Sequence, residues 1–388
     1  MKQFLLGPKL YYGTDSLEYV RKIEAEKVFI VTDEMMVKIG IVEKLTNLLS
    51  EEGKSYVIFS DVEPDPSLET VEKGLTLLVK EKPGCVIAVG GGSPIDAAKA
   101  MLLLAIRVQE RLSGEAYGVK PQFVAIPTTS GTGSEVTSYA VVTDKVKCVK
   151  IPLSDSVMYP DIAILDEGLT KTVPPSVSAD TGMDVLTHAI EAYVSKQASD
   201  ITDMYAEKAI KDVFKNLLKV YRFGEDLEAR GKLHVASCIA GIAFTNAGLG
   251  INHSLAHTLG GRFHVPHGRS NAILLPYVIA YNAGLFDGTV ETSKAAKKYA
   301  SISFMLGFPC SSTEEGVKSL IAHIVELNKK MGIPLSLQEC KIDEGEYEKS
   351  LSEMASSALH DICTTANPKD VTEEDLKQLF KLVYKGTA

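Results

Sequence analysis

The segment Cys85–Lys99 reads CVIAVGGGSPIDAAK, and it decides the expected fold of the first half of the chain. The apolar run before the glycines has the composition of a buried strand, and Pro94 stands where proline is favoured, near the start of a helix. Glycines let the backbone approach a pyrophosphate closely, and a helix N-terminus offers free N–H groups and a positive dipole. The segment therefore predicts a phosphate-binding strand–turn–helix. It matches neither G-x-G-x-x-G nor a Walker sequence, so a plain strand-to-helix turn is the alternative.

The same texture extends on both sides of this segment, because short β-branched runs alternate with longer amphipathic stretches from Lys27 to about Asp166. This alternation is typical of an α/β layer with a parallel sheet. The predicted strands are Val28–Thr32, Tyr56–Ser60, Val86–Val89, Phe123–Ile126 and Ile162–Leu165, and the predicted helices are Met35–Glu52, Ser67–Lys80 and Ile95–Arg107.

The texture changes after Val173-Pro174-Pro175, where Ala/Leu/Ile-rich amphipathic segments replace the β-rich runs. Consecutive prolines stop regular structure, and Asp180 or Thr181 is suited to cap the next helix. We therefore expect two domains in the 388 residues: a dinucleotide-binding α/β domain over residues 1–175 and a helical metal-binding domain over residues 176–388.

Two further features of the first half fit a nucleotide. The run Pro127–Glu135 reads PTTSGTGSE and follows a predicted strand, so its hydroxyls and glycines are placed to bind phosphate and ribose at a neighbouring strand end. Asp33 ends the first strand, where a carboxylate accepts from the ribose 2′-OH of NAD and repels the 2′-phosphate of NADP. A helix N-cap is an equally suitable and compatible role for Asp33.

Composition excludes several classes of function. A net charge of −9 without a Lys/Arg cluster argues against nucleic-acid binding. The apolar runs are far shorter than a membrane span, and the N-terminus does not resemble a secretory signal. The six cysteines form no C-x-x-C pair, which favours free thiols in a reducing compartment. We expect a cytoplasmic protein that acts on small molecules.

The helical half contains a cluster of metal-binding residue types. Asp184 and His188 are spaced to lie on one face of a helix, and His253 and His257 repeat the spacing. Four of the eight histidines fall between His253 and His267, which is more than packing requires. One carboxylate and several imidazoles suit Fe²⁺ or Zn²⁺, and the residue types do not choose between them. Such an ion polarises an alcohol oxygen, so that with a dinucleotide it predicts alcohol oxidation or carbonyl reduction.

These motifs, in this order, resemble the iron-containing (group III) alcohol dehydrogenase family. The resemblance covers nearly the whole chain and rests on five segments: Gly90–Ser93, Pro127–Glu135, Gly182–Tyr193, Gly248–His253 and Pro266–Gly268. It implies a Rossmann-like parallel-sheet domain followed by an all-helical domain, with the active site in the cleft between them.

The resemblance also implies roles for individual residues. It implies that four side chains bind the metal, which is Fe²⁺ with Zn²⁺ as the alternative. It implies that one histidine next to the nicotinamide is catalytic as a proton relay. It also implies that NAD(H) is held by residues of both loops and by a lysine and an acid near the ribose. These are Asp184, His188, His253 and His267 for the metal, His257 for catalysis, and Asp33, Gly91, Gly92, Ser93, Asp96, Thr128, Thr129, Thr132 and Lys150 for NAD(H).

Within the family, the segments Tyr159–Asp166, Ala198–Asp203 and Arg230–His234 look most like the 1-propanol dehydrogenases of propanediol-utilising microcompartments and their ethanol-producing relatives. This likeness suggests reduction of propanal or acetaldehyde to 1-propanol or ethanol. It also suggests a shell-enclosed location with shell proteins as partners, although neither end carries an identifiable encapsulation peptide. Family members commonly form dimers or larger assemblies, so we expect a homo-oligomer.

Other reactions fit the same motifs. A zinc-dependent polyol dehydrogenase, acting on lactaldehyde/1,2-propanediol or glycerol, and a lyase of the dehydroquinate synthase type would share both sites. The lyase needs several basic residues around a phosphorylated substrate, whereas Ile251, Leu255 and Phe263 near the predicted ligands favour a small uncharged one. A metal-dependent hydrolase would not need the nucleotide loops, and a non-catalytic, shell-associated binding protein would leave the ligand set unexplained.

Overall fold

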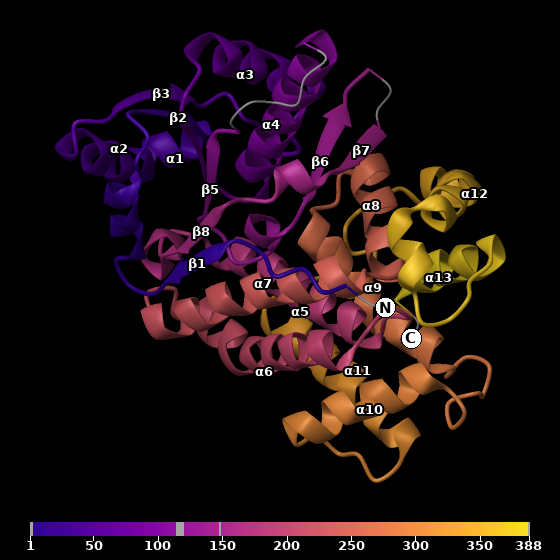
Figure 1. Ribbon diagram of the computed structural model, residues 1–388. Coiled ribbons are helices and arrows are strands. Elements are labelled where there is room, and N and C mark those ends of the chain that lie inside the picture. The colour runs from indigo at the N-terminus through magenta and orange to yellow at the C-terminus, as the bar shows by residue number, and fades with distance from the viewer. Residues whose placement is uncertain (1–2, 114–119, 147–148, 387–388) are drawn as a thin grey trace. The chain divides into compact units, whose positions relative to one another are not determined.

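A computed structural model describes residues 3–113, 120–146 and 149–386. The chain divides into two compact units, Met1–Val173 and Pro174–Ala388, each of which is described by itself (Figure 1). Helix α5 begins at Pro175 with Pro174 as its N-cap residue. The expectation that Asp180 or Thr181 caps this helix is therefore wrong. Proline is favoured in the first turn, where its missing N–H costs no hydrogen bond, so the helix begins earlier.

The first unit is built on a parallel six-stranded sheet with the order β1-β8-β5-β4-β2-β3. This arrangement, with helices between successive strands, confirms the predicted α/β class (Figure 1). Strands occur at all five predicted places. The sheet strands are β1 (Lys9–Tyr12), β2 (Lys27–Val31), β3 (Ser55–Phe59), β4 (Cys85–Gly90), β5 (Gln122–Pro127) and β8 (Ile162–Leu165), and the helices are α1 (Glu34–Lys38), α2 (Ile41–Glu51), α3 (Leu68–Glu81) and α4 (Gly92–Ser113).

Both faces of this sheet are covered by apolar packing. Successive side chains of a strand point to opposite sides, so each central strand contributes side chains to both faces. In β2, Phe29 and Val31 pack in one apolar cluster with residues of α3 and α4. Val28 and Ile30 pack in the opposite cluster, with α2 and the 3₁₀ turn Ser16–Lys22. The central strands are therefore apolar at every position, which is why they read as continuous hydrophobic runs in the sequence.

Two local features differ from the expectations. The predicted helix Met35–Glu52 is two helices, α1 and α2, because Gly40 takes a left-handed conformation with φ of 78° and turns the chain between them. An antiparallel hairpin of β6 (Tyr139–Asp144) and β7 (Val149–Ser154) was not predicted. Strand β6 alternates buried with more exposed residues and β7 has no fully buried residue, so both carry little of the apolar signal that marks the central strands.

The second unit is helical throughout residues 174–386, which confirms the predicted helical class of this half. One continuous apolar core runs through the unit, with α5 central in it. The helices are α5 (Pro175–Val194), α6 (Asp200–Arg222), α7 (Leu227–Ala247), α8 (Ile251–Phe263), α9 (His267–Ala283), α10 (Lys294–Leu306), α11 (Thr313–Lys330), α12 (Glu344–His360) and α13 (Glu373–Lys385). Among the helices described, none is by itself long and apolar enough to cross a membrane, and α7 and α8 meet that criterion only together, across a bend of 107°.

Candidate functional site

The two nucleotide loops of the first unit pack directly against each other at the carboxyl ends of β4 and β5. Gly90 ends β4 with φ of 149°, and α4 begins at Gly92. A Cβ atom on Gly92 would lie 2.8 Å from Thr132 Cγ2, and one on Gly91 would lie 3.4 Å from Thr129 Oγ1. The close packing of the second loop therefore requires glycine at position 92. The absence of a side chain at this position also leaves the N-terminus of α4 approachable by a phosphate.

The other predicted nucleotide residues surround this turn. Thr128 N–H donates to the Gly90 carbonyl at 2.8 Å, and Asp65 N–H donates to Ser93 Oγ at 3.3 Å. Lys150, in β7, forms a 2.7 Å ion pair with Asp65, the residue next to Ser93 in space. The structure thus gathers seven predicted residues in one region: Gly91, Gly92, Ser93, Thr128, Thr129, Thr132 and Lys150.

Asp33 lies beside the same turn. It is the N-cap of α1, where its Oδ1 accepts from Met36 N–H at 3.0 Å. Its other oxygen faces the glycines, because a Cβ on Gly90 would lie 3.2 Å from Asp33 Oδ2. One carboxylate oxygen thus caps the helix while the second remains directed to the nucleotide loop, so the two predicted roles of Asp33 are compatible.

Asp96 is engaged within the protein. Its two oxygens accept from Ser134 Oγ at 2.7 Å and from Val141 N–H at 2.9 Å, so it ties α4 to the second loop and to β6. Burial raises the pKa of this carboxyl, and Lys99 and its hydrogen bonds oppose the rise. A direct contact of Asp96 with NAD(H) stays a prediction.

Lys99 has a structural role that the sequence pattern did not reveal. Its fully buried ammonium lies within hydrogen-bonding distance of four oxygens between Ser134 and Tyr139, at 2.6 to 2.9 Å, and shares its three hydrogens among them. Burial lowers the pKa of Lys99 to about 8, against the attraction of Asp96 and Glu135. The buried Lys99 ammonium therefore holds the end of the second loop in place.

The metal-type residues of the second unit converge on one point. Asp184 and His188 lie one turn apart on α5, His253 lies in α8, and His267 is the first residue of α9. Ligand atoms of Asp184, His188 and His253 lie within 4.8 Å of one another, and all three residues are buried. His267 Nε2 lies 3.5 Å from Asp184 Oδ1. The structure thus brings together all four residues expected to bind the metal.

Asn271, one turn after His267, shows where these acceptors point. Its amide nitrogen lies 2.6 Å from Asp184 Oδ1, 3.1 Å from His267 Nε2 and 3.2 Å from His253 Nε2. Asn252 holds the amide in this orientation, because its Nδ2 donates to Asn271 Oδ1 at 2.9 Å. One carboxylate oxygen and two ring nitrogens from three helices therefore surround one amide nitrogen, and these are atoms that can bind a divalent cation when the rings are neutral.

The charges of this cluster also call for a cation. Asp184 and Glu191 are buried, and neither forms an ion pair with lysine or arginine among the residues described. Burial would raise the pKa of Asp184, but His188, His267 and His253 lower it well below the usual range. Burial opposes protonation of His253, yet Glu191 and Asp184 raise its pKa to about 9. Burial dominates at His267 and lowers its pKa. An ion such as Fe²⁺ or Zn²⁺ would neutralise the buried carboxylates, so the residues fit the expected metal.

His257 lies beside this cluster in a different environment. Its ring stacks on that of His267 at 5.4 Å, its side chain is 32% exposed, and its Nδ1 lies 2.8 Å from Asp361 Oδ2. Burial would raise the pKa of Asp361, but the bond to His257 lowers it to about 2. Cys363 completes this second group, and burial raises the pKa of its thiol. The exposed imidazole can exchange protons with a substrate or water, as the predicted role requires.

Three side chains of the site were missed from the sequence: Glu191, Asn271 and Asp361. Position on the ligand-bearing helices was the available signal for Glu191, which lies one turn after His188 on α5, and for Asn271, one turn after His267. Asp361 is 104 residues from His257, so no spacing could associate the two. Conversely, Ile251 and Leu255 are fully buried in the core of the helical unit. Phe263 packs partly buried against the same core, so these side chains contribute to packing between helices, and their influence on the choice of substrate stays a prediction.

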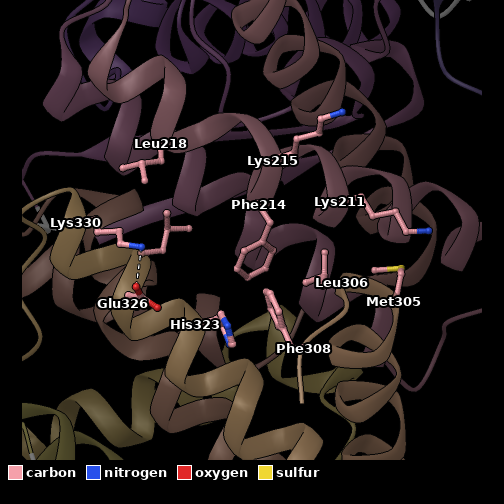
Figure 2. A pocket seen from close by; sticks show the side chains of 11 residues that line it. Lys211, Phe214, Lys215, Leu218, Met305, Leu306, Phe308, His323, Glu326 and Lys330 are labelled. Atoms are coloured by element: carbon pink, nitrogen blue, oxygen red, sulfur yellow. Dashed lines mark ion pairs between the residues drawn. The ribbon is translucent and has the colours of Figure 1, made fainter. Parts of the chain in front are cut away.

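A cavity of about 430 Å³ lies elsewhere in the helical unit, between α6, the end of α10 and α11 (Figure 2). Its wall includes the stacked rings of Phe308 and His323, 3.6 Å apart, and the Lys330–Glu326 ion pair. None of the predicted site residues lines it. This volume could hold a small ligand, but the lining contains no set of converging acceptors, so the metal-type cluster is the better candidate for chemistry.

Removing a metal ligand is expected to abolish metal binding and leave the nucleotide loops intact. Asp184→Ala and His267→Ala should each bind no stoichiometric Fe²⁺ or Zn²⁺ after dialysis, as measured by elemental analysis, while NADH binding, followed by its fluorescence, persists. His264→Asn is the control, because His264 is exposed, and asparagine tolerates its left-handed conformation. Full metal content in either ligand variant would show that the assignment is wrong.

The charge of Asp33 is expected to select NADH over NADPH. Asp33→Gly should bring the dissociation constants of the two nucleotides closer, because the repulsion of the 2′-phosphate is lost. Asp33→Asn is the matched variant, since asparagine preserves the N-cap of α1 and removes only the charge. An unchanged NADH/NADPH ratio in both variants would exclude this role for the carboxylate.

Comparison with known proteins identifies the family of the chain. Residues 8–167 match the family "Iron-containing alcohol dehydrogenase", and residues 178–384 match "Fe-containing alcohol dehydrogenase family, C-terminal". The chain is 42% identical to an NADPH-dependent butanol dehydrogenase of Clostridium saccharobutylicum, over 100% of this chain and 99% of the relative. It is 40% identical to the 1-propanol dehydrogenase PduQ of Citrobacter freundii, over 98% and 99%. A solved 1,3-propanediol oxidoreductase superposes with a TM-score of 0.89 at 33% identity, over 99% of this chain and 100% of that one.

Some relatives are longer. An aldehyde-alcohol dehydrogenase of Streptococcus pneumoniae serotype 2 (strain D39) is 44% identical over 100% of this chain and 46% of its own length. The chain thus spans about half the length of this relative. Both family matches together extend over nearly all of the sequence, and the chain belongs to the iron-containing alcohol dehydrogenase family.

Proposed function

We propose that this protein is an NAD(H)-dependent oxidoreductase that transfers a hydride between the nicotinamide and a short-chain primary alcohol or aldehyde. The convergence of Asp184, His188, His253 and His267 on one point carries the proposal, because it is the part of the structure that a nucleotide-binding protein without this chemistry would not need. Fe²⁺ is the proposed ion and Zn²⁺ the alternative, as the donor set suits both.

The ion, when bound, supplies a Lewis acid that polarises the substrate oxygen. The chain supplies the remaining functions. The glycine turn before α4 and the hydroxyls of the second loop bind the nucleotide phosphates, and Asp33 accepts from the ribose. His257 transfers the hydroxyl proton: its Nε2 accepts the proton as the hydride leaves the alcohol carbon for NAD⁺, and it returns the proton when an aldehyde is reduced.

We propose propanal or acetaldehyde as the physiological substrate. The names of two relatives, a 1-propanol dehydrogenase and a butanol dehydrogenase, support a short unbranched aldehyde. The similarity to a 1,3-propanediol oxidoreductase favours the second candidate, a diol or polyol dehydrogenase acting on lactaldehyde/1,2-propanediol or glycerol on the same scaffold. The name of the butanol dehydrogenase specifies NADPH, so the preference for NADH at Asp33 is part of the proposal for this chain.

The cell compartment and the assembly are further proposals. The sequence resemblance supports a homodimer or larger homo-oligomer and a location within a bacterial microcompartment, in contact with its shell proteins. Native shells purified without this chain would exclude the shell-enclosed location, and sedimentation at the monomer mass would exclude the homo-oligomer.

The reaction is tested by anaerobic NADH oxidation with propanal after the metal has been removed with a chelator and Fe²⁺ or Zn²⁺ restored separately. We expect turnover to return with Fe²⁺, and acetaldehyde to be accepted as well. Faster turnover with lactaldehyde than with propanal would favour the diol dehydrogenase. Tight NADH binding without turnover on any of these aldehydes, with either metal, would contradict the proposed reaction.

A further inference from the structure

The two histidines of α8 are each bound through Nδ1 to a different carboxylate. Glu191 contacts His253 Nδ1, and Asp361 contacts His257 Nδ1 at 2.8 Å. A histidine that binds a metal or accepts a proton must be neutral, and a neutral imidazole carries one hydrogen, so in that form donation from Nδ1 leaves Nε2 as an acceptor. Both contacts therefore impose the same tautomer, although the two carboxylates come from opposite ends of the helical unit's sequence.

Glu191 is fixed in place by the backbone. Its Oε1 accepts from Asn252 N–H at 2.8 Å, in the first turn of α8, where helical N–H groups have no partner within the helix. Gly250, the residue before the helix, supplies no side-chain cap, and a Cβ there would lie 2.9 Å from Glu191 Oε1. The remaining oxygen is thereby directed at His253, whose Nε2 then lies 3.6 Å from Asp184 Oδ1.

Asp361 is fixed in a similar way but faces a more open ring. Its Oδ1 accepts from Cys363 N–H at 2.8 Å as the N-cap of the 3₁₀ turn Ile362–Ala366. Its Oδ2 faces His257, whose side chain is 32% exposed, whereas that of His253 is only 2% exposed. The geometry thus distinguishes an enclosed imidazole suited to hold a metal from an accessible one suited to exchange a proton.

We propose that the two carboxylates position the two histidines of α8 for different roles. Glu191 is a positioning residue for metal binding by His253, and Asp361 is a positioning residue for proton transfer by His257. The part that concerns Asp361 rests on the proposed function. In alcohol oxidation, Nε2 of His257 takes the hydroxyl proton, the hydride goes to NAD⁺, and the imidazolium so formed is stabilised by Asp361 until it releases the proton to water.

The two roles are separated by Glu191→Gln and Asp361→Asn. Glutamine keeps the bond to Asn252 N–H through its amide oxygen, but its NH₂ then donates to His253 Nδ1 and places the ring hydrogen on Nε2, where it blocks the metal. We expect the affinity for Zn²⁺, measured by chelator competition, to fall about 10- to 100-fold. Excess metal should restore turnover.

Asp361→Asn should bind Zn²⁺ as the unaltered protein does and lose at least about tenfold in kcat, with KM for propanal unchanged and no rescue by excess metal. The ¹⁵N spectrum of labelled histidine should show a changed tautomer of His257 in this variant, a readout that does not depend on turnover. Asp180→Asn is the control, since Asp180 is bound to Arg269 near Asp184 and contacts no imidazole, and it should leave metal affinity unchanged.

Unchanged Zn²⁺ affinity in Glu191→Gln, or the same loss of metal in Asp361→Asn, would overturn the division of roles. Glu191→Asp, which keeps the charge and shortens its reach, is a second variant if glutamine prevents folding, and it should also weaken metal binding. If the unaltered protein turned over no aldehyde, the proposed function would fail, whereas the metal affinities and the tautomers would still decide the roles of Glu191 and Asp361.

Discussion

Two buried carboxylates that have no lysine or arginine partner among the residues described are the constraint around which the helical unit is organised. Asp184 and Glu191 lie two turns apart on α5, and their surroundings are imidazole, amide and backbone N–H groups. A buried anion costs several kcal/mol unless it is paired and hydrogen-bonded. Helices α8 and α9 bring the necessary donors, and the geometry that satisfies the carboxylates is the same geometry that directs three ring nitrogens and one oxygen to a single point.

The buried carboxylates of the sheet unit have a different partner. Asp96 and Glu135 are neighbours of the Lys99 ammonium, and burial raises the pKa of Glu135 to about 7. Lys99 ties down the loop between Ser134 and Tyr139 by hydrogen bonds to four oxygens. The nucleotide loops are thus shaped by a cation of the chain itself, whereas the helical unit has no lysine or arginine at Asp184 among the residues described. The predicted nucleotide loops thus have a counterion within the chain, whereas the metal-type cluster calls for a cation from outside.

Much of this architecture was predictable because it rests on local patterns. The central strands are apolar on both faces, so strands β2 to β5, β8 and the glycine turn could be placed from the sequence. Helical spacing paired Asp184 with His188 and His253 with His257, whereas the choice of His267 as a ligand came from the family resemblance. The break at Gly40 was missed because apolar periodicity continues across it, and the β6–β7 hairpin because its strands are half exposed. Asp361 was missed for another reason: its importance lies in a contact with His257, 104 positions away, which no local pattern encodes. Glu191 lies at helical spacing from His188, but its contact with His253, 62 positions away, could not be read from that spacing.

The short connection between α8 and α9 has a consequence for how this chain can vary. Only residues 264–266 separate the two helices, with His264 in a left-handed conformation, yet the rings of His253 and His267 lie 5.3 Å apart. Each residue added to a helix rotates the remainder of the chain about the helix axis by about 100°. His264 and Pro266 of this turn are exposed, which would ordinarily favour insertions, but Val265 is buried and the length of the turn is part of the arrangement of the predicted ligands. Variation in length is therefore expected in the connections among α10 to α13, whereas the length of the connection between α8 and α9 is expected to stay constant.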